Sequence, residues 1–318
     1  MLATSPSKSN YIKNTEKLSN DWGVLNSSQK EGKPNAALCF ILEVYFGLRK
    51  NRVFLQHGIT QSDARWLYYD VTKLNLFICA VKDEYDYISK TFNYPKNTVQ
   101  LCGFSRYDNL LSPYQIKRQI LVMPTMRDWL RIQSSDTLKY EVSHDFYQSD
   151  YYKHWNSLIN SNRLHKILCE YNIDVVFYLH AGMQKYVDYF ASDNQRVIIG
   201  RPKEYDVQQL LKESCVLITD YSSVFFDFAY MEKPLIYFQF DYEKFRRGQY
   251  QQGFFSYENN GFGPVVQTEA ALLDKLEMIL KCNCEMPEKY RSRTIQFFTY
   301  RDTHNCGRIY NAIANMKI

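Results

Sequence analysis

A strand–turn–helix–strand pattern spans residues 215–239 and organises the rest of the chain. Its first apolar strand (216–218) leads into a polar turn (219–223), and an amphipathic helix follows. Pro234 stops that helix before a second apolar strand at 235–238, because proline cannot continue a helix. The pattern therefore predicts one βαβ unit whose polar turn lies at the carboxyl end of the first strand.

Further apolar runs of strand length alternate with helical patterns along the chain. Strands are predicted at 52–56, 76–81, 98–104, 119–124, 174–179 and 196–200. Helices are predicted at 36–48, 82–92, 151–171 and 269–280. These elements indicate an α/β protein, and 318 residues are enough for two such domains, each with its own core.

The composition is that of a globular protein, with 45% hydrophobic and 23% charged residues. The net charge of +5 is too small to indicate nucleic-acid binding, but it is compatible with an anionic substrate or an anionic membrane surface. No apolar run approaches the roughly 20 residues of a membrane-spanning helix, and residues 1–20 lack the apolar core of a signal peptide. We therefore expect a cytoplasmic protein.

Several kinds of site have no support in the sequence. The chain contains no GxxxxGKS/T phosphate loop, no HExxH and no GxSxG, so kinase, zinc-hydrolase and serine-hydrolase functions are not indicated. Cys282 and Cys284 form a lone C-x-C pair without a second half, which argues against a zinc site. Cysteines in apolar runs, such as Cys215, are expected to be reduced thiols in the core.

The polar turn at 219–223, with the sequence TDYSS, is the strongest candidate for a ligand site. In an open α/β sheet, ligands bind at the carboxyl ends of the strands, and a helix start with unpaired N–H groups suits a phosphate. Asp220 or Ser222 could instead act only as the cap of the following helix. One residue is enough for a cap, whereas this turn has five consecutive polar or aromatic residues. We therefore expect the turn to bind a ligand.

Two histidines directly follow predicted strands. His57 comes after the strand at 52–56 and precedes Gly58, and His180 comes after the strand at 174–179. An imidazole titrates near neutral pH and can accept a proton in catalysis, and a neighbouring glycine lets a substrate approach. Each histidine could equally be a turn residue that binds backbone. The residues alone leave both interpretations open.

These motifs together resemble the CDP-glycerol glycerophosphotransferase family of teichoic-acid and capsule synthesis. The resemblance lies in TDYSS followed by FD at 226–227, KP at 233–234 and an acidic-aromatic segment, and in HG at 57–58, PTMRD at 124–128 and the closing segment 302–309. The chain departs from the family's pattern at Gln56, where Trp is frequent, at Ser62, near a Lys position, at Ala181, in place of Pro, and at Thr303, in place of Gly.

The resemblance implies a GT-B-like α/β fold, in which two Rossmann-like domains face each other across a cleft. The chain ahead of residue 36 is too short for the strands of a complete first domain, so we expect either a shortened N-terminal domain or a remnant of a longer chain. The expected divisions are a polar lead-in at 1–35, an acceptor domain at 36–128, a connection or insertion at 129–150, a CDP-donor domain at 151–300 and a closing helix at 301–318.

The resemblance also implies a reaction, in which a glycerol-phosphate-like unit moves from CDP-glycerol to a hydroxyl of a teichoic-acid or capsule-type polymer and CMP is released. In this scheme His57 accepts the proton of the acceptor. The groups expected to bind the pyrophosphate of the donor are His180, Arg127, Thr219, Asp220, Ser222 and Ser223. Asp227 is expected to hold a ribose or glycerol hydroxyl, or to make a structural bond within its helix.

Some features of this scheme have alternatives. Arg127 could form an ion pair with Asp128 or another carboxylate instead of binding a phosphate. No metal or other cofactor is required, and the sequence offers no compact carboxylate cluster to hold a metal. The donor could be CDP-ribitol or another nucleotide-activated polyol or sugar, and the chain could also be an inactive paralogue that binds donor or polymer. The family's acceptors are lipid-linked or growing polymers, so the resemblance implies peripheral attachment to the inner face of the cell membrane.

Overall fold

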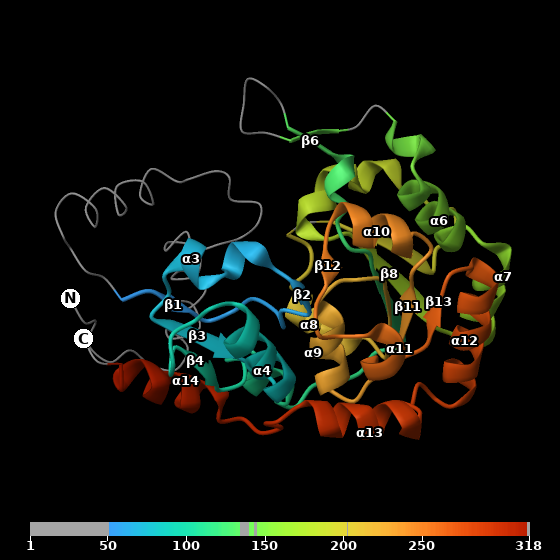
Figure 1. Cartoon of the computed structure of the whole chain (residues 1–318). Helices are drawn as coiled ribbons and strands as arrows, with labels where there is room; N and C mark the ends of the chain where they lie inside the picture. Colours follow the sequence, from blue (N-terminus) through green and yellow to red (C-terminus); the bar gives the residue numbers. More distant parts are fainter. Residues whose placement is uncertain (1–50, 134–139, 143–144, 202, 317–318) are drawn as a thin grey trace. The chain divides into compact units, whose positions relative to one another are not determined.

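The computed structural model describes residues 51–133, 140–142, 145–201 and 203–316. The described residues form two compact α/β units, which are treated separately below (Figure 1). Unit 1 consists of residues 51–109 and 298–316, and unit 2 consists of the described residues between 110 and 297. The predicted lead-in at 1–35 and the predicted helix at 36–48 lie outside the described residues.

Unit 1 is built on a parallel sheet with the strand order β1-β3-β4. The three strands of this sheet are β1 (Val53–Phe54), β3 (Leu76–Cys79) and β4 (Val99–Leu101), and unit 1 also contains the short strand β2 (Ser62–Asp63), which lies outside the sheet. Its helices are η1 (Arg65–Leu67), α3 (Tyr69–Thr72), α4 (Lys82–Thr91) and α14 (Asn305–Ala314), with α5 (Tyr107–Leu110) at the boundary. The central strand β3 is buried along its whole length, as its unbroken apolar sequence requires. β3, α4 and β4 together form one βαβ unit.

The carboxyl-terminal segment belongs to unit 1, and polar contacts hold it there. Arg308 forms an ion pair with Asp302 at 2.8 Å, and its Nε donates to the carbonyl of Cys102 at 2.9 Å. Gly103 has a φ of +78°, and a Cβ at this position would lie 1.8 Å from Oδ1 of Asn305. Only glycine therefore allows α14 to pack so closely against the turn after β4.

Unit 2 contains a six-stranded sheet with the order β13-β11-β10-β5-β8-β9, in which every paired strand is parallel. The strands are β5 (Gln119–Met123), β8 (Asp174–Tyr178), β9 (Val197–Gly200), β10 (Val216–Thr219), β11 (Leu235–Phe238) and β13 (Val265–Val266). An antiparallel pair, β6 (Arg131–Gln133) with β7 (Tyr140–Val142), and a short strand, β12 (Gln251–Gln252), lie outside this sheet. Each strand predicted from the sequence has an observed counterpart whose ends agree to within a few residues, whereas the short strands β2, β6, β7, β12 and β13 were not predicted.

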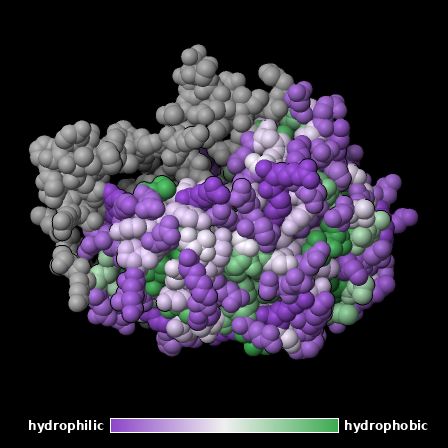
Figure 2. All heavy atoms as spheres, viewed as in Figure 1, coloured by the Kyte–Doolittle hydropathy of each residue, from purple (hydrophilic) through white to green (hydrophobic). Residues whose placement is uncertain are grey.

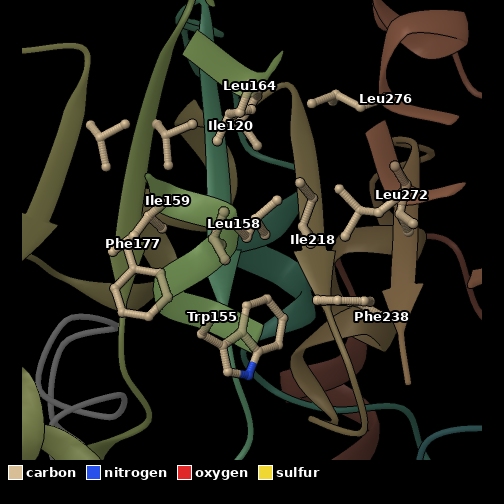
Figure 3. Close-up of a cluster of buried hydrophobic side chains, with 14 of the residues drawn as sticks. Ile120, Trp155, Leu158, Ile159, Leu164, Phe177, Ile218, Phe238, Leu272 and Leu276 are labelled. Carbon is tan, nitrogen blue, oxygen red and sulfur yellow. The ribbon is translucent and has the colours of Figure 1, made fainter. Parts of the chain in front are cut away.

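Helices cover both faces of the unit 2 sheet. The helices of unit 2 are α6 (Asp150–Ile159), α7 (Asn162–Glu170), α8 (Val207–Glu213), α9 (Val224–Tyr230), α10 (Tyr242–Gly248), α11 (Tyr257–Asn260), α12 (Glu269–Lys281) and α13 (Glu288–Phe297), with η2 (Asp128–Leu130), η3 (Phe146–Gln148) and η4 (Ala181–Tyr189) between them. Side chains alternate between the faces of a strand, so Ile120, Ile218 and Phe238 point to the same face. There they pack with Trp155 of α6 and Leu272 of α12 (Figure 3). The helices α8 and α9, whose buried residues are not part of this cluster, contact the opposite face.

The helix predicted at 151–171 is two helices in the structure, α6 and α7. Asn160 ends α6, and its side chain donates to the carbonyl of Asn156 at 3.0 Å. Ser161 then takes the N-cap position of α7. Asn and Ser compete with the helix for backbone hydrogen bonds, which explains why the chain turns at this point even though the apolar spacing continues on both sides.

The division into units differs from the predicted domains. The chain passes from unit 1 to unit 2 between residues 109 and 110, whereas the sequence placed residues up to 128 in the first domain. The reason is β5, which pairs with β10 and β8 in the unit 2 sheet. The described part of the predicted connection at 129–150 consequently lies inside unit 2.

Cys215 and Cys284 lie side by side in unit 2, with their Sγ atoms 3.2 Å apart. The S–H of Cys284 donates to the sulfur of Cys215, and this bond lowers the pKa of Cys215 to about 7 despite its burial. Cys282, the other member of the C-x-C pair, is exposed. Among the described residues, no group of three or more His, Cys, Asp or Glu is arranged to hold a metal ion.

Hydrophilic side chains dominate the face shown in Figure 2, where hydrophobic ones are interspersed among them. The exposed large hydrophobic residues that the structure describes are scattered over several elements, such as Val71, Ile198 and Met278. Within the described residues, every helix is too short or too polar to span a membrane.

Candidate active site

The order of strands in unit 2 brings three segments to one edge of its sheet. From β5 the chain proceeds outward through β8 and β9, and it then returns to the other side of β5 with β10. The position between β5 and β10 is therefore the topological switch point, where ligands bind in open α/β sheets. Because these strands are parallel, residues 124–127 after β5, residues 219–223 at the end of β10 and His180 after β8 all lie at the same edge.

Arg127 lies at the centre of this edge and is completely buried. Its Nη2 donates to Oδ2 of Asp220 at 2.8 Å and to Oδ1 of Asp241 at 3.0 Å, and its Nε donates to Oδ2 of Asp241 at 2.8 Å. Its Nη1 donates to the carbonyl of Thr125 at 2.8 Å. Burial alone lowers the pKa of Arg127, but attraction to the two carboxylates outweighs burial and raises it.

Asp220 and Thr219 face into the protein and are also fully buried. Oδ1 of Asp220 accepts hydrogen bonds from the backbone N–H of Thr125 at 2.8 Å, from the N–H of Tyr221 at 2.6 Å and from the Thr125 hydroxyl. The hydroxyl of Thr219 donates to the carbonyl of Met123 at 2.7 Å. Both residues thus tie the end of β10 to the loop that follows β5.

Tyr221 completes this buried cluster. Its hydroxyl donates to Oδ1 of Asp241 at 3.1 Å, and its ring stacks on that of Phe245 at a centroid distance of 3.7 Å. The guanidinium of Arg127 lies 5.0 Å from the centroid of the Tyr221 ring. Burial, followed by the charges of Asp241 and Asp220, raises the pKa of Tyr221, so its hydroxyl keeps the proton that it donates.

The sequence left open whether Arg127 binds a phosphate or forms an ion pair with a carboxylate, and the structure shows the ion pair. It forms an ion pair, and its partners are Asp220 and Asp241 rather than Asp128. Asp241 is a site residue that the sequence pattern did not predict. A signal was present, because Asp220 directly follows β10 and Asp241 comes shortly after β11, and carboxylates after neighbouring parallel strands meet at one edge.

Ser222 and Ser223 differ from the first two residues of the turn. Neither hydroxyl has a hydrogen-bond partner within the part of the chain that the structure describes. Ser223 occupies the N-cap position of α9, but its side chain makes no capping bond, and neither Asp220 nor Ser222 caps this helix. The two serines are therefore the groups of the turn that remain available to a ligand. Asp227, in the first turn of α9, is 6% exposed.

His180 is half-buried and is the N-cap of η4. Its Nδ1 accepts a hydrogen bond from the backbone N–H of Gly182 at 3.1 Å, so in the neutral ring the proton resides on Nε2. Gly182 is packed against the loop after β5, since a Cβ at this position would lie 2.6 Å from Sδ of Met126. The backbone thus orients the imidazole and leaves Nε2 as its donor atom.

His57 lies in unit 1, in the turn after β1, and is exposed. The edge of the Phe54 ring approaches its imidazole with a centroid distance of 6.3 Å. The preceding residue, Gln56, has a φ of +65°, which is unusual for a residue other than glycine. Its side chain folds back to donate to the Thr60 hydroxyl at 2.8 Å. The turn is therefore closed by its own side chains, and the residue His57 within it is exposed.

The Lys233-Pro234 motif has a structural role in unit 2. Lys233 is buried, and its Nζ donates to the carbonyls of Leu211 at 2.8 Å, Lys212 at 2.6 Å and Ser214 at 2.7 Å. Burial lowers the pKa of Lys233 to about 7, but the three acceptors match the three N–H groups of an ammonium ion. Lys233 thereby binds carbonyls at the end of α8, where the last C=O groups of a helix have no partner within the helix itself.

Comparison with protein families shows one match over most of the chain. The family model described as CDP-Glycerol:Poly(glycerophosphate) glycerophosphotransferase matches residues 52–315. This range includes both histidines and the TDYSS turn, and it confirms the resemblance inferred from the sequence.

Similar curated proteins act in teichoic-acid synthesis. The minor teichoic acid biosynthesis protein GgaB of Bacillus subtilis (strain 168) is 35% identical over 284 residues, which cover 87% of this chain and 31% of GgaB. The teichoic acid poly(glycerol phosphate) polymerase of the same strain is 31% identical over 111 residues, which cover 34% of this chain and 14% of that protein. The chain thus spans less than a third of the length of these relatives.

Solved structures agree on the fold. The wall teichoic acid polymerase TagF has a TM-score of 0.52 and 19% identity, with 76% of this chain and 57% of that chain covered. A putative UDP-N-acetylglucosamine 2-epimerase from Listeria monocytogenes has a TM-score of 0.53 and 13% identity, with 98% of this chain and 81% of that chain covered. These neighbours confirm the α/β fold class of GT-B type that the sequence predicted.

Proposed function

This chain belongs to the CDP-glycerol:poly(glycerophosphate) glycerophosphotransferase family, and from that premise we propose that it transfers glycerol phosphate from CDP-glycerol to a hydroxyl of a teichoic-acid or capsule-type polymer. The observation that carries the proposal is the family match over residues 52–315, because it includes every group to which we assign a role. A TagF structure obtained after a soak with CDPG supports the choice of donor class.

In the proposed reaction, the acceptor oxygen attacks the phosphorus that carries glycerol. The bond from this phosphorus to the bridging oxygen of the pyrophosphate breaks, and CMP leaves with that oxygen. The proton of the acceptor passes to the imidazole of His57, which is exposed and able to accept it near neutral pH. Neither a metal ion nor another cofactor has a role in this scheme.

We assign the binding of the donor's phosphates to Ser222, Ser223 and His180. The two hydroxyls have no competing partner in the described chain, and the imidazole is oriented by Gly182 so that Nε2 donates. Preformed donors of this kind stabilise the charge that grows on the departing phosphate. To Arg127, Thr219 and Asp220 we assign a supporting role, because their side chains hold together the loops that carry these donors.

A second candidate donor is CDP-ribitol. The teichoic acid poly(ribitol-phosphate) polymerase of Bacillus spizizenii (strain ATCC 23059 / NRRL B-14472 / W23) is 32% identical over 96 residues, covering 30% of this chain and 14% of that protein. The serine hydroxyls contact phosphate, which both donors share, so they do not discriminate between the two polyols. For the acceptor we propose a lipid-linked polymer at the inner face of the cell membrane, which the net charge of +5 favours electrostatically.

The proposed activity predicts that the purified full chain releases CMP from CDP-glycerol when a lipid-linked teichoic-acid acceptor is present. Chromatography measures the release of CMP from CDP-glycerol and CDP-ribitol and of UDP or UMP from UDP-N-acetylglucosamine in parallel, each with and without acceptor. If acceptor-dependent CMP release is seen with CDP-ribitol and not with CDP-glycerol, the donor is CDP-ribitol. Binding of a CDP compound without any CMP release would instead support the inactive paralogue.

Replacing Ser222 or Ser223 by alanine is expected to raise the Kd for CDP-glycerol about tenfold, because each hydroxyl donates to a charged phosphate oxygen. The thermal midpoint of unfolding should not change, since neither hydroxyl has a partner in the described protein. Ser157→Ala is a matched control, because this exposed serine of α6 bonds Glu269 at 2.6 Å. Unchanged donor affinity in both turn variants, measured by calorimetry, would remove the serines from the site.

A further inference from the structure

A buried carboxylate lies beneath the turn that carries His57. Glu84, in the first turn of α4, is completely buried. Its Oε1 accepts hydrogen bonds from the backbone N–H of Thr60 at 2.7 Å and from Nε2 of Gln56 at 3.1 Å. Its Oε2 accepts from the backbone N–H of Ala80 at 2.8 Å. One carboxylate therefore joins the end of β3 to both ends of the turn at 56–60.

The two oxygens of Glu84 have different tasks. Val81 is the N-cap of α4, so Glu84 stands at N3, where a Glu side chain commonly reaches back to the N–H groups at the start of its own helix. The contact of Oε2 with the N–H of Ala80, the residue before the N-cap, resembles this arrangement. Oε1 instead crosses to the neighbouring strand end and binds the residues on either side of His57. A helix cap alone does not require this second set of bonds.

The turn needs such an anchor because its backbone is in an unfavourable conformation. Gln56 has a φ of +65°, which costs free energy for a residue with a side chain, and such conformations persist where the surroundings hold them. Gln56 is held by its bonds to Glu84 and to the Thr60 hydroxyl, at 3.1 and 2.8 Å. His57 lies between these two fixed residues, so its backbone position depends on them.

Placing the carboxylate here is unfavourable in itself. Burial raises the pKa of Glu84 to about 7, although the N–H groups of Thr60 and Ala80 and the charge of Arg106 lower it. Glu84 in turn contributes to the raised pKa of the buried thiol of Cys79, for which burial is the main cause. Because burying this carboxylate costs free energy, we expect that its role is to fix the geometry of its hydrogen-bond partners and not to stabilise the fold.

We propose that Glu84 is a positioning residue for His57, and that it holds the 56–60 turn so that the imidazole meets the acceptor hydroxyl. This role rests on the proposed function, in which His57 is the base. Glu84 itself does not touch substrate. It acts on the proton-transfer step through the position of His57, and therefore on kcat rather than on donor binding.

The role is tested by CMP release from CDP-glycerol with lipid-linked acceptor, using the full chain. Glu84→Gln is expected to lower kcat by roughly 10- to 100-fold, as a displaced catalytic group does, while the KM for CDP-glycerol changes by less than about twofold. Asp83→Asn is the matched control, because it removes a carboxylate from the same helix turn at an exposed position and should leave kcat unchanged.

A double variant separates positioning from a general structural effect. If Glu84 acts through His57, then adding Glu84→Gln to His57→Ala should slow the reaction no further. The ¹⁵N-labelled imidazole of His57, assigned by its loss in His57→Ala, should shift or broaden in Glu84→Gln and not in Asp83→Asn. Should Glu84→Gln fail to fold, Gln56→Ala breaks the same anchor without touching the charge, and a threefold or larger loss of kcat is expected.

Full kcat in Glu84→Gln or, if it does not fold, in Gln56→Ala would overturn the positioning role and leave the proposed function intact. An additional loss in the double variant, equal to that in the wild-type background, would overturn it as well, because the effect would then not pass through His57. Absence of CMP release from the wild-type chain would instead overturn the proposed function, and the positioning role with it.

Discussion

Replacing Arg127 by methionine is expected to lower the free energy of unfolding of unit 2 by about 3–5 kcal/mol, the largest stability effect that we anticipate in this protein. The substitution leaves Asp220 and Asp241 without their cation, and these carboxylates are 0% and 5% exposed. Neither can regain water without opening the loops after β5 and β10. Urea unfolding followed by circular dichroism measures the loss as a shift of the midpoint at constant slope.

Arg163→Met is the matched control in the same unit. Arg163 also binds two carboxylates, Asp274 at 2.7 Å and Glu277 at 2.8 Å, but its side chain is 41% exposed. Solvent screens such surface pairs, so the expected loss is below about 1 kcal/mol. Equal losses in the two variants would contradict the buried-cluster interpretation. If Arg127→Met is instead as stable as the wild type, the carboxylates are not held by Arg127 alone.

His57→Ala is expected to reduce acceptor-dependent CMP release by about 10²- to 10⁴-fold, the usual effect of removing a general base. The thermal midpoint should stay within experimental error, because His57 is exposed and its truncation removes little packing. Donor affinity should also be unchanged, since the base contacts the acceptor. The comparison requires initial rates at saturating donor and a parallel binding measurement.

His304→Ala is the control for this prediction, because His304 is another exposed histidine of unit 1 that makes no side-chain capping bond. Its replacement should leave CMP release within about twofold of the wild type, in line with the small effects of surface substitutions. Similar rates in His57→Ala and wild-type protein would assign the base to another residue. A loss that is accompanied by weaker donor binding would place His57 in the donor site.

For the turn at 219–223, the sequence predicted the position in the fold but not the orientation of the individual side chains. Its place at the carboxyl end of a strand was predicted from apolar periodicity, and the structure places it at the end of β10. The different orientations of its residues were not predictable. Thr219 and Asp220 point inward because Met123 and Arg127 lie opposite them, and those residues are about 95 positions away in the chain.

The sequence by itself determined the alternation of strands and helices, the family and the positions of both histidines, because periodicity and short motifs are local properties. Only the tertiary structure decided that β5 joins the sheet of unit 2, that Arg127 is neutralised by Asp220 and Asp241, and that Glu84 supports the His57 turn. The physical reason is that all buried parallel strands read as similar apolar runs. Which of them become neighbours, and hence which distant charges meet at their ends, depends on packing between residues far apart in the chain.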